Sequence, residues 1–180
     1  MIIRKKFRFE GAHIVRNCTS QRCRENIHGH SYVVEVFLKP DPAHHSVMFM
    51  NAVLLNNIKE FIHSFDHAFT LWDKEPDEVK DAIYRINTRV AEIPVSPSAE
   101  GYALLFLFGI DQMISAAKLA DGEGEMKLHA VGVHETMSGY AESSIEDLNL
   151  VRFTMEDIKF NPGIKGEWKD MEWWTRIPGC

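Results

Sequence analysis

Hydrophobic and polar residues alternate near the start of the chain and predict a first β-strand. Between residues 3 and 10, Phe7 and Phe9 share one side of the extended chain and charged residues occupy the other. Extending this two-residue period places His13 on the same side as the two phenylalanines. Gly11 lies on the same side as well, so the extended chain after the first strand presents His13 on the face of Phe7 and Phe9.

A second alternating segment, from His28 to Lys39, predicts a long strand that ends at the prolines of residues 40–42. Its apolar side consists of Tyr32, Val34, Val36 and Leu38. The segment 16–26 between the two strands is polar, contains Cys18 and Cys23, and has no helical period.

Two helices are predicted in the middle of the chain. Residues 52–65 place apolar side chains at helical spacing. A second helix has Ser96 as N-cap and Pro97 at its first position, with a body from Ala99 to about residue 118. Between these helices, residues 66–95 are expected to form a polar connection that includes a short helix around 76–86.

Strands are also predicted at residues 126–136 and 139–144, after a glycine-rich break at 121–124. The resulting order is β-β-α-α-β-β, which is an α+β pattern with an antiparallel sheet and two helices on one face. From residue 145 the pattern is weak. A short strand at 148–153 and a tail with Trp168, Trp173 and Trp174 are expected there.

Composition narrows the class of protein. The chain has 180 residues, enough for one domain with a hydrophobic core. Its formal net charge of −6 argues against nucleic acid as the main partner. The first residues lack the pattern of a secretory signal, and the longest apolar stretch, 102–110, is too short to span a membrane. Three cysteines do not make a disulfide framework. These features lead us to expect a cytoplasmic protein without a membrane or nucleic-acid partner.

The sequence His28-Gly29-His30 is the strongest chemical signal. Residues two apart in a strand point to the same side, so both imidazoles face one way. If the two strands pair, His13 completes a three-imidazole cluster. Three neutral imidazoles with one open position are typical of a catalytic zinc site. Two other interpretations stay open: a histidine pair without metal, and a closed structural zinc site in which Cys23 is the fourth ligand.

Four separated motifs occur in an order that resembles one known family. They are Phe9-Glu10-Gly11-Ala12-His13; Cys23 followed by His28-Gly29-His30; Asp66-His67; and His134-Glu135-Thr136. With these motifs the chain resembles the family of 6-pyruvoyltetrahydropterin and 6-carboxytetrahydropterin synthases over about residues 3–142. The resemblance implies the tunnelling fold (T-fold) for a domain at 1–144, and leaves 145–180 as an extension of unknown role. It also implies a homo-oligomer, a hexamer of paired trimers.

The resemblance implies a role for each matching residue. His13, His28 and His30 correspond to the ligands of Zn²⁺. Cys23, Asp66 and His67 correspond to the catalytic residues, with the cysteine thiolate as base and the Asp-His pair relaying protons. Glu135 corresponds to the pterin anchor, and Ser98 and Glu100 to the helix-start segment that helps to hold the pterin.

Simpler structural roles remain open for several of these residues. Asp66-His67 would also suit the end of a helix, where a cation is favourable. Glu135 would also suit an exposed strand end. Four residues separate Cys23 from His28, where the family has three or five, so Cys18 and Glu25 compete for the role of base.

The resemblance implies that the substrate is 7,8-dihydroneopterin triphosphate. We expect the 6-carboxytetrahydropterin synthase reaction of queuosine (7-deazaguanine) biosynthesis, which releases acetaldehyde and triphosphate. The alternative within the family is triphosphate elimination to the pyruvoyl product. The alternative from another class is a non-catalytic protein with a structural zinc site. Arg16, Arg22 and Arg24 lie in the loop before His28, where they would either meet the triphosphate or stay in solvent.

Overall fold

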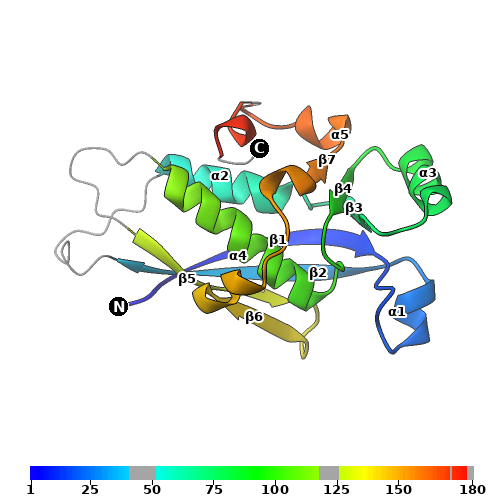
Figure 1. Cartoon of the computed structure of the whole chain (residues 1–180), viewed down its shortest axis with the longest axis horizontal. Helices are drawn as coiled ribbons and strands as arrows, with labels where there is room; N and C mark the ends of the chain where they lie inside the picture. The colour runs from blue at the N-terminus through cyan, green and yellow to red at the C-terminus, as the bar shows by residue number, and fades with distance from the viewer. Residues whose placement is uncertain (41–51, 118–125, 171, 178–180) are drawn as a thin grey trace.

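A seven-stranded β-sheet forms the framework of the computed structural model, which describes residues 1–40, 52–117, 126–170 and 172–177. The strands lie in the order β6-β5-β2-β1-β3-β4-β7 (Figure 1). Their bounds are β1 Ile3–His13, β2 His28–Pro40, β3 Ala68–Trp72, β4 Val90–Ile93, β5 Met126–His134, β6 Tyr140–Ser144 and β7 Lys159–Phe160. The expected α+β fold class is confirmed, with more strands than the sequence pattern indicated.

The antiparallel pair of β1 and β2 lies at the centre of the sheet. Its register runs from Ile3 opposite Leu38 to His13 opposite His28. β5 pairs antiparallel with β2, and β6 with β5. The alternation of buried and exposed residues confirms the predicted faces, because the apolar sides of both central strands lie on one face of the sheet.

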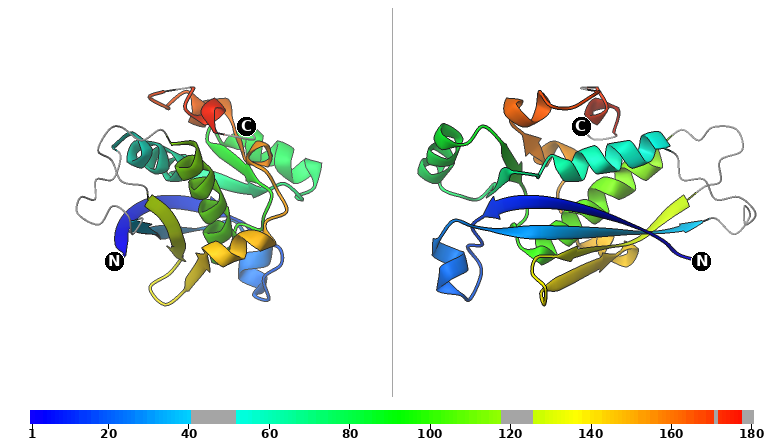
Figure 2. Two further views of the ribbon diagram at one scale, coloured as in Figure 1. Left: turned by 60° about the vertical axis from the view of Figure 1, so that its left-hand side comes forward. Right: turned by 180° about the vertical axis from the view of Figure 1, so that it is seen from behind.

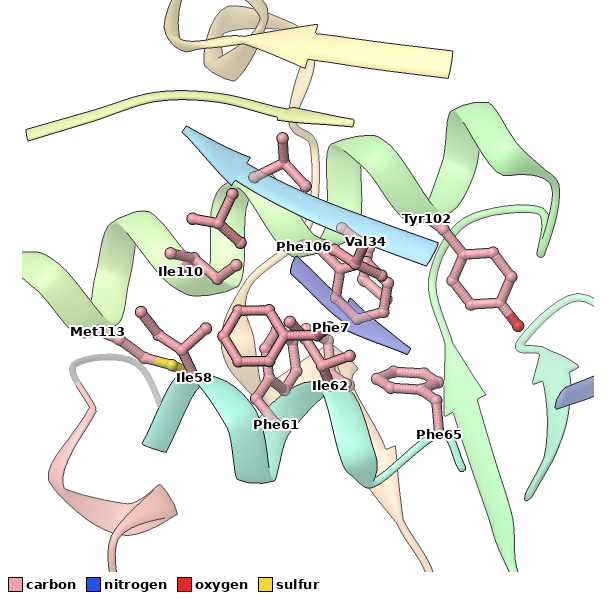
Figure 3. Close-up of a cluster of buried hydrophobic side chains, with 14 of the residues drawn as sticks. Phe7, Val34, Ile58, Phe61, Ile62, Phe65, Tyr102, Phe106, Ile110 and Met113 are labelled. Atoms are coloured by element: carbon pink, nitrogen blue, oxygen red, sulfur yellow. The ribbon is translucent and has the colours of Figure 1, made fainter. Parts of the chain in front are cut away.

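Helices α2 (Ala52–His63) and α4 (Ala99–Ala116) form a layer over that face (Figure 2). Phe61 of α2 and Phe106 of α4 meet edge to face, with ring centroids 5.6 Å apart, above Phe7 and Val34 of the sheet (Figure 3). No helix in the described ranges is both long and apolar enough to cross a membrane. The predicted break at 121–124 lies outside the described residues.

Helix α4 begins two residues later than the sequence suggested. Its N-cap is Ser98, whose Oγ accepts a hydrogen bond from the Gly101 N–H at 3.2 Å, so the prediction of Ser96 as N-cap is wrong. The cause lies outside the helix: the imidazole of His13 hydrogen-bonds the carbonyl oxygen of Pro97. The Pro97 oxygen therefore points toward the sheet and does not accept the N–H of Gly101, which donates to Ser98 Oγ instead.

The segment between the two long helices adds two strands that the sequence pattern did not reveal. β3 pairs parallel with both β1 and β4, so the sheet is mixed and not wholly antiparallel as expected. Both strands are short and buried along nearly their whole length, which removes the alternation that marks a half-exposed strand. The helix expected around 76–86 is confirmed as α3 (Asp77–Ile86). A further short helix, α1 (Gln21–Glu25), precedes β2.

The C-terminal extension packs onto the helical layer (Figure 1). The strand predicted at 148–153 is wrong, because a 3₁₀ helix, η2, occupies Ile145–Leu150. The remaining elements are η3 (Met155–Asp157), β7 paired with β4, α5 (Pro162–Lys165) and η4 (Trp174–Arg176). Trp168, Trp173 and Trp174 are buried in the same hydrophobic core as Phe61. The extension therefore shares its core with the sheet domain.

Candidate functional site

Three histidines converge where β1 ends and β2 begins. His13 is the last residue of β1 and lies opposite His28, the first residue of β2. His30 follows two residues later on the same side of the strand. One ring nitrogen of each histidine lies within 4.8 Å of the others, and His13 Nε2 is 3.0 Å from His28 Nε2. Strand pairing thus brings together the three residues that the sequence proposed as metal ligands.

Backbone carbonyls orient two of the rings. His13 Nδ1 lies 2.5 Å from the carbonyl oxygen of Pro97, and His28 Nδ1 lies 3.0 Å from that of Asn26. A ring that donates its Nδ1–H to a carbonyl presents the lone pair of Nε2, which is the usual arrangement of a metal-bound imidazole. In that tautomer the two Nε2 lone pairs face each other, an arrangement that a metal ion between them would stabilise.

The spacing of the rings also fits a metal. Nitrogen ligands in a tetrahedral zinc site stand about 3.3 Å apart, given Zn–N bonds of about 2.0–2.1 Å. The neutral form that a metal needs is favoured at His13, because burial, reinforced by His28 and His30, lowers its pKa to about 4. The donor set and its geometry therefore fit a divalent ion such as Zn²⁺.

Glu135 follows β5 directly and lies beside the histidines. Its Oε1 is 3.8 Å from His13 Nε2 and 4.0 Å from His30 Nε2. The Tyr32 hydroxyl donates a hydrogen bond to the same oxygen at 3.3 Å. Burial raises the pKa of Tyr32 well above its ordinary value, so the phenol stays protonated and remains a donor. A half-buried carboxylate thus stands at the edge of the cluster.

The other residues expected at the pterin end lie at the start of α4. The Ser98 hydroxyl is engaged as the N-cap of that helix, so it has a structural partner already. Glu100 is exposed in the first turn of α4. Among the described residues, no hydrogen bond or ion pair connects Glu100 with the histidine cluster.

Asp66 and His67 form a turn between α2 and β3. Asp66 Oδ1 accepts the backbone N–H of Glu10 at 2.8 Å, and Asp66 Oδ2 lies 3.1 Å from His67 Nδ1. Burial alone would raise the pKa of Asp66, but the Glu10 N–H and the His67 ring outweigh it and the pKa is lowered. The carboxylate is therefore ionised and can orient the imidazole.

The Asp66–His67 pair faces a different part of the surface from most of the cluster. His67 and His30 line one shallow depression of about 400 Å³, together with Glu10 and Ser31. Within the described ranges, no hydrogen bond or ion pair joins Asp66 or His67 to the three histidines or to Cys23. In a single chain, the predicted catalytic residues are thus not assembled into one contact network.

Cys23 lies in α1 and is half-buried, as is Cys18, and both thiols are free. The Cys23 carbonyl accepts the N–H of Val15 at 3.0 Å, which ties the loop to the end of β1. The third cysteine, Cys180, lies outside the described residues. Among the residues that the structure describes, neither of the two thiols has a polar partner.

Two of the three arginines of this loop lie beside carboxylates. Arg16 Nε donates to both carboxylate oxygens of the buried Glu75, at 2.8 and 3.0 Å. Arg24 contacts the Cys18 carbonyl and the carboxylate of Glu25. The ion pair between Arg16 and Glu75 therefore anchors the loop, and the contact of these arginines with triphosphate stays a prediction.

Sequence reasoning missed two groups at the site. The apolar pattern indicates Tyr32 only as a core residue, although its place two residues after His30 on the same strand face also predicts a position beside the cluster. The carbonyl of Pro97 gave no signal, because a backbone group 84 residues away in sequence meets His13 only through tertiary packing.

The chain is similar in sequence to known tetrahydropterin synthases. The family model described as 6-pyruvoyl tetrahydropterin synthase matches residues 2–146. A 6-carboxy-5,6,7,8-tetrahydropterin synthase of Helicobacter pylori strain J99 is 38% identical over 182 residues, covering 98% of this chain and 91% of the relative. The enzyme of the same name from Aquifex aeolicus is 31% identical, covering 78% of this chain and 95% of the relative.

Solved structures share the fold at lower identity. An uncharacterised protein of Wolinella succinogenes superposes with a TM-score of 0.62 at 19% identity, covering 81% of this chain and 98% of that one. A 6-pyruvoyltetrahydropterin synthase of Plasmodium vivax, with a catalytic glutamate replaced by alanine, gives 0.55 at 20% identity, covering 79% and 97%. These likenesses establish the T-fold.

Proposed function

We propose that this chain acts as a zinc-dependent 6-carboxy-5,6,7,8-tetrahydropterin synthase. It belongs to the 6-pyruvoyl tetrahydropterin synthase family. Its substrate is then 7,8-dihydroneopterin triphosphate, which reacts with water to give 6-carboxy-5,6,7,8-tetrahydropterin, acetaldehyde and triphosphate in queuosine biosynthesis. The observation that carries the proposal is the cluster of His13, His28 and His30 beside the carboxylate of Glu135. The choice within the family follows the names of the relatives that are 31–38% identical.

In this proposal the three histidines hold Zn²⁺ through one ring nitrogen each. When bound, the ion supplies positive charge that stabilises the negative charge developing on the substrate's side-chain oxygens. The chain's contribution is to keep the rings neutral and aimed. Burial of His13 and the carbonyls of Pro97 and Asn26 do this.

Glu135 serves as the pterin anchor. One edge of a pterin ring offers two roughly parallel N–H donors, which a carboxylate accepts as a bidentate pair. Tyr32 donates to Oε1 and so limits the rotation of the carboxylate. The distances of 3.8 and 4.0 Å from Glu135 to two imidazoles put the ring anchor close to the metal ligands, as a short side chain on the pterin requires.

Cys23 is the proposed base, and Asp66 with His67 moves the proton. These groups are not in contact within one chain, so the proposal includes a homo-oligomer in which a neighbouring copy supplies the missing group. Glu25 is the competing base, since the Plasmodium vivax relative has a catalytic glutamate. Glu25 is exposed here, and its carboxylate is already engaged by Gln21 and Arg24.

Product analysis tests the proposal. Purified protein is loaded with zinc and incubated with 7,8-dihydroneopterin triphosphate, and acetaldehyde, triphosphate and the pterin product are measured. We expect one acetaldehyde per triphosphate, and loss of both in Cys23→Ala but not in Cys18→Ala. Release of triphosphate with a pyruvoyl product and no acetaldehyde would establish the second family activity instead. Loss of activity in Glu25→Gln and not in Cys23→Ala would transfer the base role to Glu25.

The structural-zinc alternative makes a separate prediction. A closed site with Cys23 as fourth ligand gives the intense thiolate-to-metal absorption of Co²⁺ bound to sulfur. In our proposal Cys23 stays off the metal, so cobalt-substituted wild type and Cys23→Ala should have the same spectrum. A thiolate band that disappears in Cys23→Ala would reject the catalytic site.

A further inference from the structure

We infer that Arg89 is a positioning residue for the Asp66–His67 pair and that Glu167, in the C-terminal extension, holds Arg89 in place. The inference rests on the catalytic role proposed above for that pair. It goes further by giving the extension a function, since the family model ends at residue 146. The argument begins with the backbone of the turn that carries His67.

This turn holds an unfavourable backbone conformation. His67 has φ of 51°, the only positive φ of a non-glycine residue in the described part of the chain. Side chains with a Cβ disfavour this region, so surrounding contacts must maintain it. On one side, two hydrogen bonds to Glu10 of β1 maintain this conformation. The His67 N–H donates to the Glu10 carbonyl at 2.6 Å, and the Asp66 carboxylate accepts the Glu10 N–H.

On the other side, the turn is held by Arg89. Its Nε donates to the Asp66 carbonyl at 2.9 Å, and its Nη2 donates to the His63 carbonyl at 3.3 Å. His63 is the last residue of α2, where carbonyl groups lack partners within the helix and a cation is favourable. One guanidinium therefore bridges the helix end and the catalytic turn.

Arg89 is itself held by the extension. Its Nη1 forms an ion pair with Glu167 Oε2, and only 17% of the arginine side chain is exposed. The segment around Glu167 is fixed to α2 by two further bonds. Trp168 Nε1 donates to Ser64 Oγ at 2.9 Å, and the Lys169 N–H donates to Glu60 Oε1 at 2.9 Å. These two bonds place the backbone at Glu167, whose side chain is 64% exposed and reaches Arg89 from the edge of the packed segment.

The imidazole has little else to orient it. The side chain of His67 is 75% exposed, and it lies between the depression shared with His30 and a second cavity of about 720 Å³. The extension forms one wall of that larger cavity, and α2 and Arg89 form others. Because the ring is not packed, its direction is set by the backbone turn and by Asp66.

Kinetic analysis of four variants tests the inference. We expect Arg89→Gln to lower kcat about 10- to 100-fold, as small displacements of a catalytic group do, with KM and zinc content unchanged. Arg89→Lys should recover part of the loss, since one ammonium can still reach a carbonyl. Glu167→Gln should cause a smaller loss than Arg89→Gln. Arg85→Gln, an exposed arginine of α3, is the control and should match wild type.

A double variant separates positioning from general damage to the fold. If Arg89 acts through His67, Arg89→Gln has no further effect on kcat in a His67→Ala background. Multiplicative effects, or an unchanged kcat in Arg89→Gln, would overturn the inference. Should Arg89→Gln not fold, the same comparison is made with Arg89→Lys and Glu167→Gln.

A crystal structure of Arg89→Gln gives a readout that does not depend on activity. We expect φ of His67 to leave the positive region, or the contact between Asp66 and His67 to be lost. An unchanged turn would overturn the inference even if activity fell. If His67→Ala alone kept full kcat, the proposed catalytic pair would fail, whereas the effect of Arg89 on the turn would still be decided by the structure.

Discussion

The Nε2 atoms of His13 and His28 lie 3.0 Å apart, while the Nδ1 atom of each ring faces a backbone carbonyl. This relationship follows from strand pairing, because the two residues are direct partners at the end of the β1–β2 ladder. When both Nδ1–H groups donate to these carbonyls, the two Nε2 lone pairs face each other and suit a metal ion between them. The arrangement explains why three histidines are gathered here, one of them fully buried.

Metal content should depend on each of the three histidines. We expect His13→Ala, His28→Ala and His30→Ala each to reduce bound zinc to background, because two imidazoles alone hold the ion weakly. Metal per chain is measured after purification and dialysis. His129→Ala, which removes a half-buried histidine elsewhere in the sheet, is the control and should keep its zinc. Full zinc in His30→Ala would show that the ion has other ligands.

Gly29 should be needed for close approach of the two central strands. A Cβ at this position would lie 2.9 Å from the Gly11 carbonyl oxygen, a backbone atom that cannot turn aside. We expect Gly29→Ala to destabilise the protein by about 1–3 kcal/mol and to weaken zinc binding, since His28 and His30 flank the glycine. Chemical denaturation and metal titration measure the two effects. Lys5→Ala, an exposed change on β1, serves as control, and equal stability of the two variants would contradict the prediction.

Glu135→Gln should weaken substrate binding. The amide replaces one acceptor oxygen by a donor and removes the charge, so the bidentate pairing with the pterin edge is lost. We expect KM to rise about 10- to 100-fold, in line with the loss of a hydrogen bond to a charged group. Zinc content is measured alongside, because the carboxylate lies close to two metal ligands. Glu78→Gln on exposed α3 is the matched control, and a KM unchanged in Glu135→Gln would remove the anchor role.

The metal-free protein should lose stability in mild acid. The pKa of His13 is about 4 in the folded protein because of burial and the two neighbouring histidines, against 6.5 for an ordinary histidine. Between these values the unfolded chain binds more protons, so the free energy of unfolding falls as the pH drops from 6.5 toward 4. One proton contributes a slope of at most about 1.4 kcal/mol per pH unit.

Urea unfolding of metal-free wild type and His13→Gln over this pH range isolates that contribution. We expect the curve of wild type against pH to be steeper than that of His13→Gln below pH 6.5. Parallel curves would show that His13 does not titrate between these values in the folded protein.

The extension should contribute to stability through a buried hydrogen bond. Trp168 Nε1 donates to Ser64 Oγ, and both residues are buried. Trp168→Phe keeps an aromatic ring but removes the donor, at an expected cost of about 1–2 kcal/mol. A double-mutant cycle with Ser64→Ala measures the interaction itself, and a coupling energy of zero would contradict it.

The sequence predicted the central elements well because they are half-exposed. β1, β2, β5 and β6 each have one face toward the core and one toward solvent, which leaves a readable alternation. α2 follows the apolar spacing of an amphipathic helix. β3 and β4 lack this contrast, since both are buried almost throughout. The cap of α4 was misplaced because the Pro97 carbonyl is engaged by His13, a contact that no local pattern contains.

By itself, the sequence determined the identity and the shared face of His13, His28 and His30, because a period of two residues follows from strand geometry alone. It also determined the family, since four motifs in a fixed order are a property of the chain. Only the tertiary structure decided which groups aim those rings and which hold Asp66 and His67. The contacts concerned join residues far apart in sequence: 84 residues separate His13 from Pro97, and 23 separate Asp66 from Arg89. Arg89 and Glu167 are 78 residues apart. Contacts over such separations arise from tertiary packing, so the local pattern of apolar and polar residues does not predict them.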